Sequence, residues 1–208
     1  CGMTRSGKTH SAMDIVSTAA KAYPGSKFFF IEGKGSSDWD DLSKKLSSLP
    51  VEKNNFSNIL DVVWEEYEKR QEIQKDLTKN GNLCTSFGEL RKSENLNRIF
   101  LVIDELSAVH TRELGASNVI STITRLASEA SMYGIHIIAT TQRVEQLPRG
   151  IMSNMTAKII YPLPDGDLQY LECDKIPQSQ FVEFAVQVNG LTDNAGNKNI
   201  LCRRNSED

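Results

Sequence analysis

The stretch Gly2-Met3-Thr4-Arg5-Ser6-Gly7-Lys8-Thr9 decides the fold of this 208-residue chain. It matches the pattern G-x-x-x-x-G-K-T in full. In that pattern, the glycines let the backbone turn tightly enough for successive N–H groups to converge on phosphates. Lys8 would place a positive charge near the β and γ phosphates, and the Thr9 hydroxyl would ligate Mg²⁺. The stretch therefore predicts a phosphate-binding loop for ATP.

An amphipathic helix is predicted directly after the loop, from residue 9 to residue 22, and it ends before Pro24-Gly25. The positive dipole end of this helix favours a bound phosphate. A plain glycine-rich turn would not require such a helix, so we favour the nucleotide-binding interpretation. The residues of this segment that we expect to bind ATP are Gly2, Met3, Thr4, Arg5, Ser6, Gly7, Lys8, Thr9 and His10.

Short apolar runs alternate with helical patterns along the rest of the chain. The runs cover residues 27–31, 99–103, 135–140 and 157–161, and the helical patterns cover residues 57–79 and 116–133. Nearly continuous apolar runs are typical of strands buried on both faces. Strands that alternate with helices favour a mostly parallel sheet with helices on both sides. We therefore predict an α/β, three-layer, RecA-like P-loop fold.

Two adjacent carboxylates follow the most apolar run. Ile99–Ile103 delivers Asp104 to the carboxyl end of a central strand, where α/β sheets place their ligands. An acid in that position helps to bind ATP by holding Mg²⁺ through water. Glu105 is expected to point the other way and to act as general base on the attacking water. The alternative, a strand end that simply becomes hydrophilic, is disfavoured by the phosphate loop in the same chain.

Two further polar residues are candidates for catalysis. Gln142 follows the run that ends at Thr140, and a neutral amide there would orient the lytic water and sense the γ-phosphate. The alternative for Gln142 is an exposed polar turn. Arg125 lies beside the inward face of its helix and would reach a neighbouring subunit's nucleotide as an arginine finger. From periodicity alone, an ordinary surface arginine is the simpler interpretation of Arg125.

Composition narrows the class of protein. Hydrophobic residues make up 39% and charged residues 25%, as in ordinary globular domains, and no apolar run is long enough to span a membrane. The four cysteines are scattered without a C-x-x-C pair, which argues against a zinc site and a disulfide framework. The net charge of −3 argues against a stand-alone duplex-binding module. The same charge is compatible with DNA binding by a ring that confines its cations to a central pore.

Two further features are predicted to lie at the surface. Residues 82–98 are polar and aperiodic, which indicates a surface excursion. Glu66 and Arg70 form an i,i+4 pair that we expect on the wet side of the second helix.

We divide the chain into a P-loop core, residues 1–161, and a C-terminal extension of the same domain, residues 162–208. Within the extension, residues 182–188 and 198–203 indicate a hairpin. A P-loop hangs from the end of a buried strand. The loop begins at the second residue of this sequence, so no such strand precedes it. We therefore expect that the first strand is truncated or missing and that this is a motor domain cut out of a longer protein.

With these residues identified, the chain resembles the FtsK/SpoIIIE family of DNA translocases, within the FtsK–HerA group of hexameric P-loop motors. Four segments in the family's order carry the resemblance: GMTRSGKT (2–9), FFFIEGKG (28–35), FLVIDELSAV (100–109) and ITRLASEASMYGIHIIATTQR (123–143). They are similar to the family's GxTGSGKS loop, its strand and D-P-K-G turn, its L-I-D-E-F-A-D-L segment, and its I-A-R-L-A…A-T-Q-R segment. The last match places Arg125 at the trans-acting finger and Gln142 at the sensor glutamine, and so favours a functional role for both.

The resemblance implies an ATPase that forms a ring, most simply a hexamer, and moves double-stranded DNA through its centre. ATP and Mg²⁺ would be its cofactors, bound between subunits. It also implies a cytoplasmic location, either free or as the cytoplasmic domain of a membrane-anchored protein. Membrane contact would then come only from flanking regions outside this chain.

The sequence departs from the family in several places. Glu32 and Gly33 stand where the family has aspartate and proline, and Val144 follows Arg143 where the family has proline. Residues 163–208 lack the D-S-R-x-I-L and G-x-G-D-M-L patterns of chromosome translocases, so a conjugative coupling ATPase or a phage motor fits at least as well. A type VII protein-secretion ATPase, a viral genome-packaging ATPase and a non-hydrolysing scaffold are the alternatives.

Overall fold

The computed structural model describes residues 1–3, 6–47, 49–112, 117–163, 167–171, 184–188 and 199–202. Thr4 and Arg5 of the phosphate loop therefore lie outside the described residues, as does most of the chain after residue 171. Among the described residues, no helix is both long enough and apolar enough to cross a bilayer.

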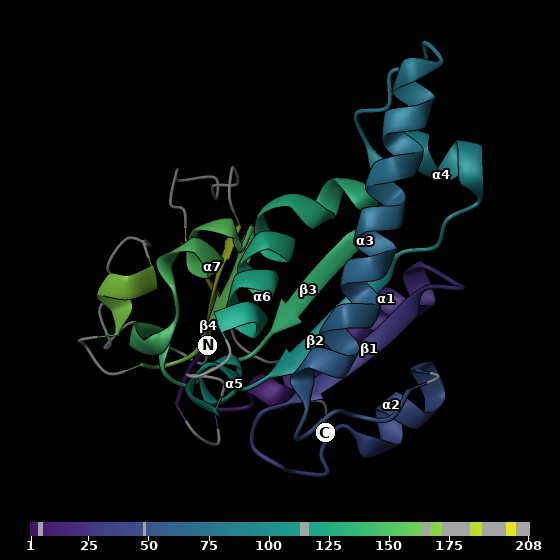
Figure 1. The fold of residues 1–208 in the computed structure, drawn as a ribbon. Helices are drawn as coiled ribbons and strands as arrows, with labels where there is room; N and C mark the ends of the chain where they lie inside the picture. Colours follow the sequence, from purple (N-terminus) through teal and green to yellow (C-terminus); the bar gives the residue numbers. More distant parts are fainter. Residues whose placement is uncertain are drawn as a thin grey trace.

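A three-stranded parallel sheet forms the centre of the molecule (Figure 1). Its order is β1-β2-β3, and its strands are β1 (Lys27–Glu32), β2 (Ile99–Asp104) and β3 (Ile135–Ala139). The register pairs Lys27 with Ile99 and Ile99 with Ile135, so all three strands start level and end at one edge. The α/β fold with a parallel sheet that the sequence predicted is confirmed.

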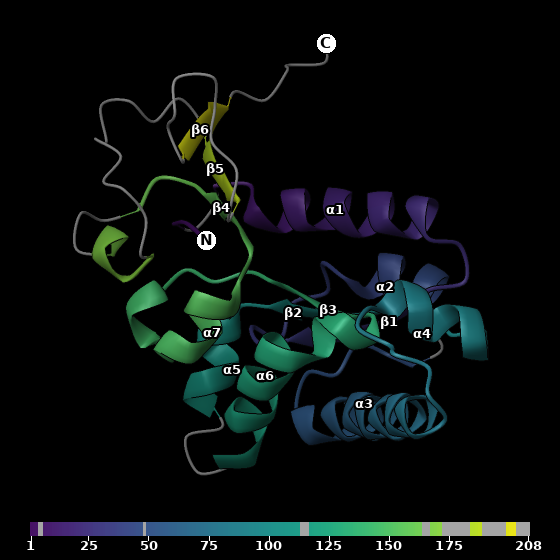
Figure 2. The same ribbon diagram turned by 90° about the horizontal axis from the view of Figure 1, so that it is seen from above.

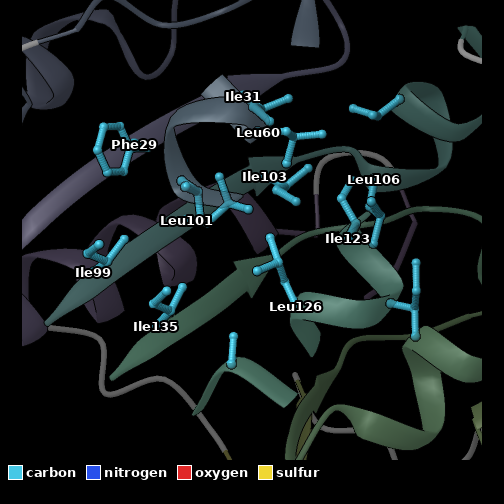
Figure 3. Close-up of a cluster of buried hydrophobic side chains, with 14 of the residues drawn as sticks. Phe29, Ile31, Leu60, Ile99, Leu101, Ile103, Leu106, Ile123, Leu126 and Ile135 are labelled. Carbon is cyan, nitrogen blue, oxygen red and sulfur yellow. The ribbon is translucent and has the colours of Figure 1, made fainter. Parts of the chain in front are cut away.

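Helices cover both faces of this sheet, as three layers require (Figure 2). On one face, α1 (Lys8–Ala22) and α2 (Asp40–Leu46) pack on alternate strand residues that include Phe28, Phe30 and Val102. On the other face, α3 (Phe56–Lys79) and α6 (Ser117–Glu129) pack on the intervening residues. Figure 3 shows this second cluster, with Phe29, Ile31, Ile99, Leu101, Ile103 and Ile135 from the strands and Leu60, Ile123 and Leu126 from the helices.

A second sheet is antiparallel and lies beside the first residues of the chain. Its order is β4-β5-β6, with β4 (Ala157–Ile160), β5 (Phe184–Val188) and β6 (Asn199–Cys202). The run 157–161 was expected in the parallel sheet, and the pairing of β4 with β5 corrects that expectation. Apolar runs identify strands but not their partners, so the direction of this pairing could not be seen in the sequence.

The start of the chain separates β4 from the end of β3. The Cys1 amino group donates to the Ile159 carbonyl at 2.7 Å, and the Tyr161 N–H donates to the Cys1 carbonyl at 2.9 Å. On the other side, the Gly2 N–H donates to the Thr141 carbonyl at 3.2 Å. Figures 1 and 2 both place the N-terminus next to β4. These bonds fix the beginning of the phosphate loop between the two sheets.

Residues 82–98 lie mostly at the surface, as predicted, but the expectation that they are irregular is wrong. The segment contains α4 (Phe87–Glu94), whose Phe87 and Leu90 side chains are buried in the core. A capping box starts this helix, because the Ser86 hydroxyl accepts from the Glu89 N–H and the Glu89 carboxylate accepts from the Ser86 N–H. Two helical turns are too short for periodicity to identify, although the Ser86–Glu89 spacing is a capping-box signal in the sequence.

The predicted wet position of Arg70 is also wrong, because this side chain is only 1% exposed. Its guanidinium donates to the Tyr133 carbonyl at 2.7 Å, to the Asn97 carbonyl at 2.8 Å and to the Glu66 carboxylate at 2.9 Å. It therefore ties α3 to the turns at the starts of β2 and β3. Three further short helices were not predicted: α2, α5 (Leu106–Arg112) and α7 (Arg149–Asn154).

Candidate functional site

The phosphate loop turns into α1 through a glycine that has a left-handed backbone. Gly7 has φ 88° and caps the helix that begins at Lys8. Gly2 lies so close to β4 that a Cβ there would stand 2.4 Å from the Tyr161 Cβ, so only glycine fits. The Met3 N–H donates to the Pro162 carbonyl at 3.2 Å and fixes the next residue. The two glycines of the motif thus serve a close approach and a left-handed turn.

Lys8 is the charged residue at the centre of this loop. Its side chain is 7% exposed, and its ammonium donates to the Met3 carbonyl at 2.5 Å and to the Ser6 hydroxyl at 3.4 Å. Burial lowers the pKa of the Lys8 ammonium from its usual value, and the nearby positive charge of Lys34 lowers it further. A buried ammonium next to a second cation is a favourable place for an anion.

A cavity of about 490 Å³ opens beside the loop. It is lined by the helix start, by the turn after β1 and by the segment after β3; the residues are Ser6, Gly7, Lys8, Thr9, His10, Met13, Lys34, Asp38 and Gln142. The amino-terminal end of α1 therefore faces a space of the size that small-molecule ligands occupy. The described residues of the predicted ATP-binding set, other than Gly2, Met3 and Asp104, line this cavity.

Asp104 is the last residue of β2 and lies beside Glu32 in the register of the sheet. Its side chain is buried, at 1% exposure, and one carboxylate oxygen accepts from the Thr140 hydroxyl. Within the described part of the chain, the other oxygen, Oδ2, is buried and has no hydrogen-bond partner. A carboxylate oxygen left over in this way suits a hydrated Mg²⁺, which prefers oxygen ligands. Thr9 and Asp104 are therefore the residues that would hold the metal.

Glu105 follows in a strained backbone conformation, with φ 56°. Its N–H donates to the Thr140 hydroxyl oxygen at 2.9 Å, so this single threonine side chain joins the two acids. The Glu105 carboxylate accepts from the Ser107 hydroxyl at 2.6 Å and from the Gln142 N–H at 2.8 Å. Its second oxygen lies 3.0 Å from the Lys34 ammonium.

These contacts decide the protonation state of Glu105. Burial by itself raises the pKa of the carboxyl, but the hydrogen bonds from Ser107, the Gln142 N–H and Lys34 outweigh it and hold the pKa below its usual value. The residue is therefore a carboxylate at neutral pH, which is the form that a general base needs. Asp104 and Glu105 are not among the residues that line the cavity, but Glu105 contacts two that do, Lys34 and Gln142.

The structure brings most of the predicted site residues together. The end of β2 supplies Asp104 and Glu105, the segment after β3 supplies Gln142, and the start of α1 supplies Lys8 and Thr9. In a parallel sheet, all strands end at one edge, so residues that are far apart in sequence converge there. The roles that the sequence suggested for these residues remain predictions.

Arg125 lies apart from this group, on the exposed side of α6. Its side chain is 53% exposed and pairs with the Glu129 carboxylate at 3.4 Å. Its guanidinium carbon stands 4.9 Å from the centre of the Trp64 ring on α3. Arg125 is not among the residues that line the cavity beside the phosphate loop, and its predicted role as a finger stays a prediction.

Sequence reasoning missed two residues of the site. Lys34 lines the cavity and pairs with Glu105, and Thr140 joins the two acids. A signal was present for Lys34, because it occupies a Gly-Lys-Gly turn after a buried strand, at the same edge where the other strands end. Thr140 had no such signal, since a threonine at a strand end is ordinary.

Comparison of the sequence with family models and with curated proteins finds no match. Solved structures do match. The pCW3 conjugation coupling protein TcpA, in its monomer form with ATPγS, gives a TM-score of 0.74 at 20% identity, over 91% of this chain and 56% of that one. EssC ATPases 2 and 3 from Geobacillus thermodenitrificans give 0.71 at 16% identity, over 90% of this chain and 36% of that one.

A third match is the genome-packaging NTPase B204 of Sulfolobus turreted icosahedral virus 2, in complex with ATPγS. It gives a TM-score of 0.50 at 15% identity, over 90% of this chain and 88% of that one. The chain thus spans about half of the coupling-protein structure and about a third of the EssC structure. At identities of 15–20%, these matches show that the fold is shared.

Proposed function

We propose that this chain is an ATP-hydrolysing motor domain that acts in a ring of identical subunits and moves double-stranded DNA. The observation that carries the proposal is the meeting of the phosphate loop, Asp104, Glu105 and Gln142 at one edge of the parallel sheet. A nucleotide cavity with a carboxylate base beside it is the arrangement that phosphate-bond hydrolysis requires. Two of the matched structures contain ATPγS, which supports nucleotide binding.

Each residue has a defined task in this proposal. Lys8 and the N–H groups of the loop neutralise the phosphates, while Thr9 and Asp104 hold Mg²⁺, which would offset the charge that develops on the γ-phosphate. Glu105 takes a proton from the attacking water. Gln142, whose N–H already bonds to Glu105, senses the γ-phosphate with its side-chain amide.

Arg125 of the adjacent subunit would complete the site as a trans-acting finger. The exposed position of Arg125 on α6 supports this, since a finger must be accessible to another subunit. A finger that crosses the interface also makes hydrolysis depend on assembly, which is how a ring couples its nucleotide state to movement.

The choice of DNA as cargo rests on two supports. The sequence segments resemble DNA translocases, and the conjugation coupling protein has the highest TM-score of the matches described above. The alternative is a polypeptide cargo, which the EssC match supports with a TM-score of 0.71. A viral genome-packaging role is the further alternative, and the B204 match at 0.50 supports it less. The net charge of −3 is compatible with DNA as cargo, because a ring can confine a few cations to its pore while its outer face stays acidic.

The catalytic assignment is tested by replacing Glu105 with glutamine. We expect Glu105→Gln to lower the ATP turnover number by about 100-fold or more, because general-base catalysis contributes roughly 10²–10⁴-fold. Glu72→Gln on α3 is the matched control, since that side chain is 73% exposed and faces solvent. Full DNA-stimulated turnover in Glu105→Gln would rule out its role as the base. Zero turnover in the assembled wild-type ring would instead support a scaffold.

The cargo is tested by measuring turnover with duplex DNA and with unfolded polypeptide. We expect duplex DNA to raise the wild-type rate and the increase to fade as salt rises from about 50 to 200 mM, because phosphate contacts release counterions. Stimulation by polypeptide alone, without a steep salt dependence, would favour a secretion ATPase.

A further inference from the structure

Two lysines serve one cavity, and they come from different parts of the chain. Lys8 belongs to the phosphate loop, and Lys34 to the turn between β1 and α2. The Lys34 side chain is 37% exposed, so it can move, whereas the Glu105 side chain to which it is paired is only 5% exposed. Lys34 therefore both lines the cavity and contacts the buried carboxylate of Glu105.

The backbone that carries Lys34 is fixed. The Glu32 side chain is fully buried, and its two carboxylate oxygens accept from the Lys34 N–H at 2.8 Å and the Ser36 N–H at 2.6 Å. The Gly33 N–H donates to the Asp104 carbonyl at 2.9 Å, and a Cβ on Gly33 would stand 2.7 Å from the Glu105 carbonyl oxygen. The turn is therefore packed directly on the two acids. Any change in the position of the ammonium must come from the lysine side chain beyond Cα.

From this fixed backbone, the Lys34 ammonium can reach two anionic partners. One is the Glu105 carboxylate, at 3.0 Å in this structure. The other is an anion in the cavity that Lys34 lines together with Lys8 and Gln142. An ammonium is a compact point charge on a flexible stem, and it follows the stronger anion. A triphosphate with its terminal group in this cavity carries more negative charge than one carboxylate.

We propose that Lys34 is a ligand of the γ-phosphate whose transfer from Glu105 to the nucleotide uncovers the general base. This inference rests on the proposed function, and it adds a residue and a switching step to it. The carboxylate of Glu105 is covered while Lys34 is paired with it, and it becomes available to water when ATP draws the ammonium away. ADP lacks the γ-phosphate and leaves the pair in place. The base would then be exposed only when there is a γ-phosphate to attack.

The switch has a thermodynamic signature, because Glu105 and the γ-phosphate compete for one ammonium. Removing the Glu105 charge relieves the repulsion between this carboxylate and the phosphates of ATP. It also frees Lys34, and ATP binding becomes stronger by more than the lost repulsion alone. The same removal in a chain without Lys34 gives only the loss of repulsion. The two effects therefore differ if Lys34 contacts the phosphate once it is released, and they are equal if it never does.

The experiment measures the dissociation constants of ATPγS and ADP, with Mg²⁺, by isothermal titration calorimetry. The chains compared are the wild type, Lys34→Met, Glu105→Gln and the double variant. We expect Lys34→Met to weaken ATPγS binding at least fivefold and to leave ADP binding unchanged. We expect Glu105→Gln to strengthen ATPγS binding about fivefold more in the wild-type chain than in the Lys34→Met background, the scale of a partly exposed ion pair.

Two control variants test whether the effect is specific to the position of Lys34 and whether it depends on the positive charge there. Lys44→Met removes a 75% exposed lysine of α2 and should change neither affinity, while Lys34→Arg keeps the charge and should restore most of the ATPγS preference. Equal effects of Glu105→Gln in both backgrounds, or equal loss of ATPγS and ADP binding in Lys34→Met, would overturn the inference alone. A wild-type chain that binds neither nucleotide would overturn the proposed function and this inference together.

Discussion

Replacing Thr140 with valine keeps the shape of the side chain and removes its hydroxyl. That hydroxyl donates to the Asp104 carboxylate and accepts from the Glu105 N–H at 2.9 Å, and the threonine is only 6% exposed. A hydrogen bond to a carboxylate contributes about 1.5–3 kcal/mol, and a buried N–H left without an acceptor costs about 1–3 kcal/mol. The strained backbone of Glu105 also loses the bond that helps to hold it. We expect Thr140→Val to lower the free energy of unfolding by about 3–5 kcal/mol.

The assay is urea-induced equilibrium unfolding followed by circular dichroism, with ATP turnover measured on the same preparations. Thr141→Val is the matched control, because Thr141 is equally buried but its hydroxyl makes only a 3.5 Å contact with the Arg143 carbonyl. We expect this control to change stability by less than about 1 kcal/mol. Thr140→Ser should keep both stability and turnover, since it retains the hydroxyl. The reasoning is refuted if Thr140→Val unfolds within about 0.5 kcal/mol of the Thr141→Val control.

Two further predictions concern buried basic groups. Arg70→Met should lower the free energy of unfolding by about 3–5 kcal/mol, because it removes a buried side chain that joins the Tyr133 and Asn97 carbonyls. The control is Lys69→Met on the exposed side of α3, which should lower the free energy of unfolding by less than about 0.5 kcal/mol. Comparable unfolding midpoints for the two variants would contradict this. Burial, and then the charge of Arg98, lower the pKa of His136, so the folded state resists its protonation. Its contribution to stability should be complete above the unfolded pKa of about 6.5 and should be lost as the pH falls through the lower folded value. Unfolding measured from pH 7.5 to 5 should show this loss in the wild type and a weaker one in His136→Gln; identical pH profiles would argue against it.

The parallel sheet and its three longer helices, α1, α3 and α6, could be predicted because their signals are local. The runs at β1, β2 and β3 are apolar along nearly their whole length, and that pattern is typical of central strands. The phosphate loop could be predicted from its own residue pattern, G-x-x-x-x-G-K-T. In contrast, α4 is two turns long, and Arg70 repeats the i,i+4 spacing of a solvated pair although it is buried. Periodicity reports the average face of a long helix and says little about one position or a short segment.

The sequence by itself determined which residues have the chemistry of a nucleotide site: a lysine and a threonine in a glycine loop, two acids after one strand and an amide after another. Only the tertiary structure decided that Thr140 joins the two acids, that Lys34 lies over Glu105, and that Arg125 rests on Trp64 away from its own cavity. The physical reason is that such contacts join residues far apart in the chain. They depend on strand register and on the direction of each side chain, and these are set when the whole sheet packs.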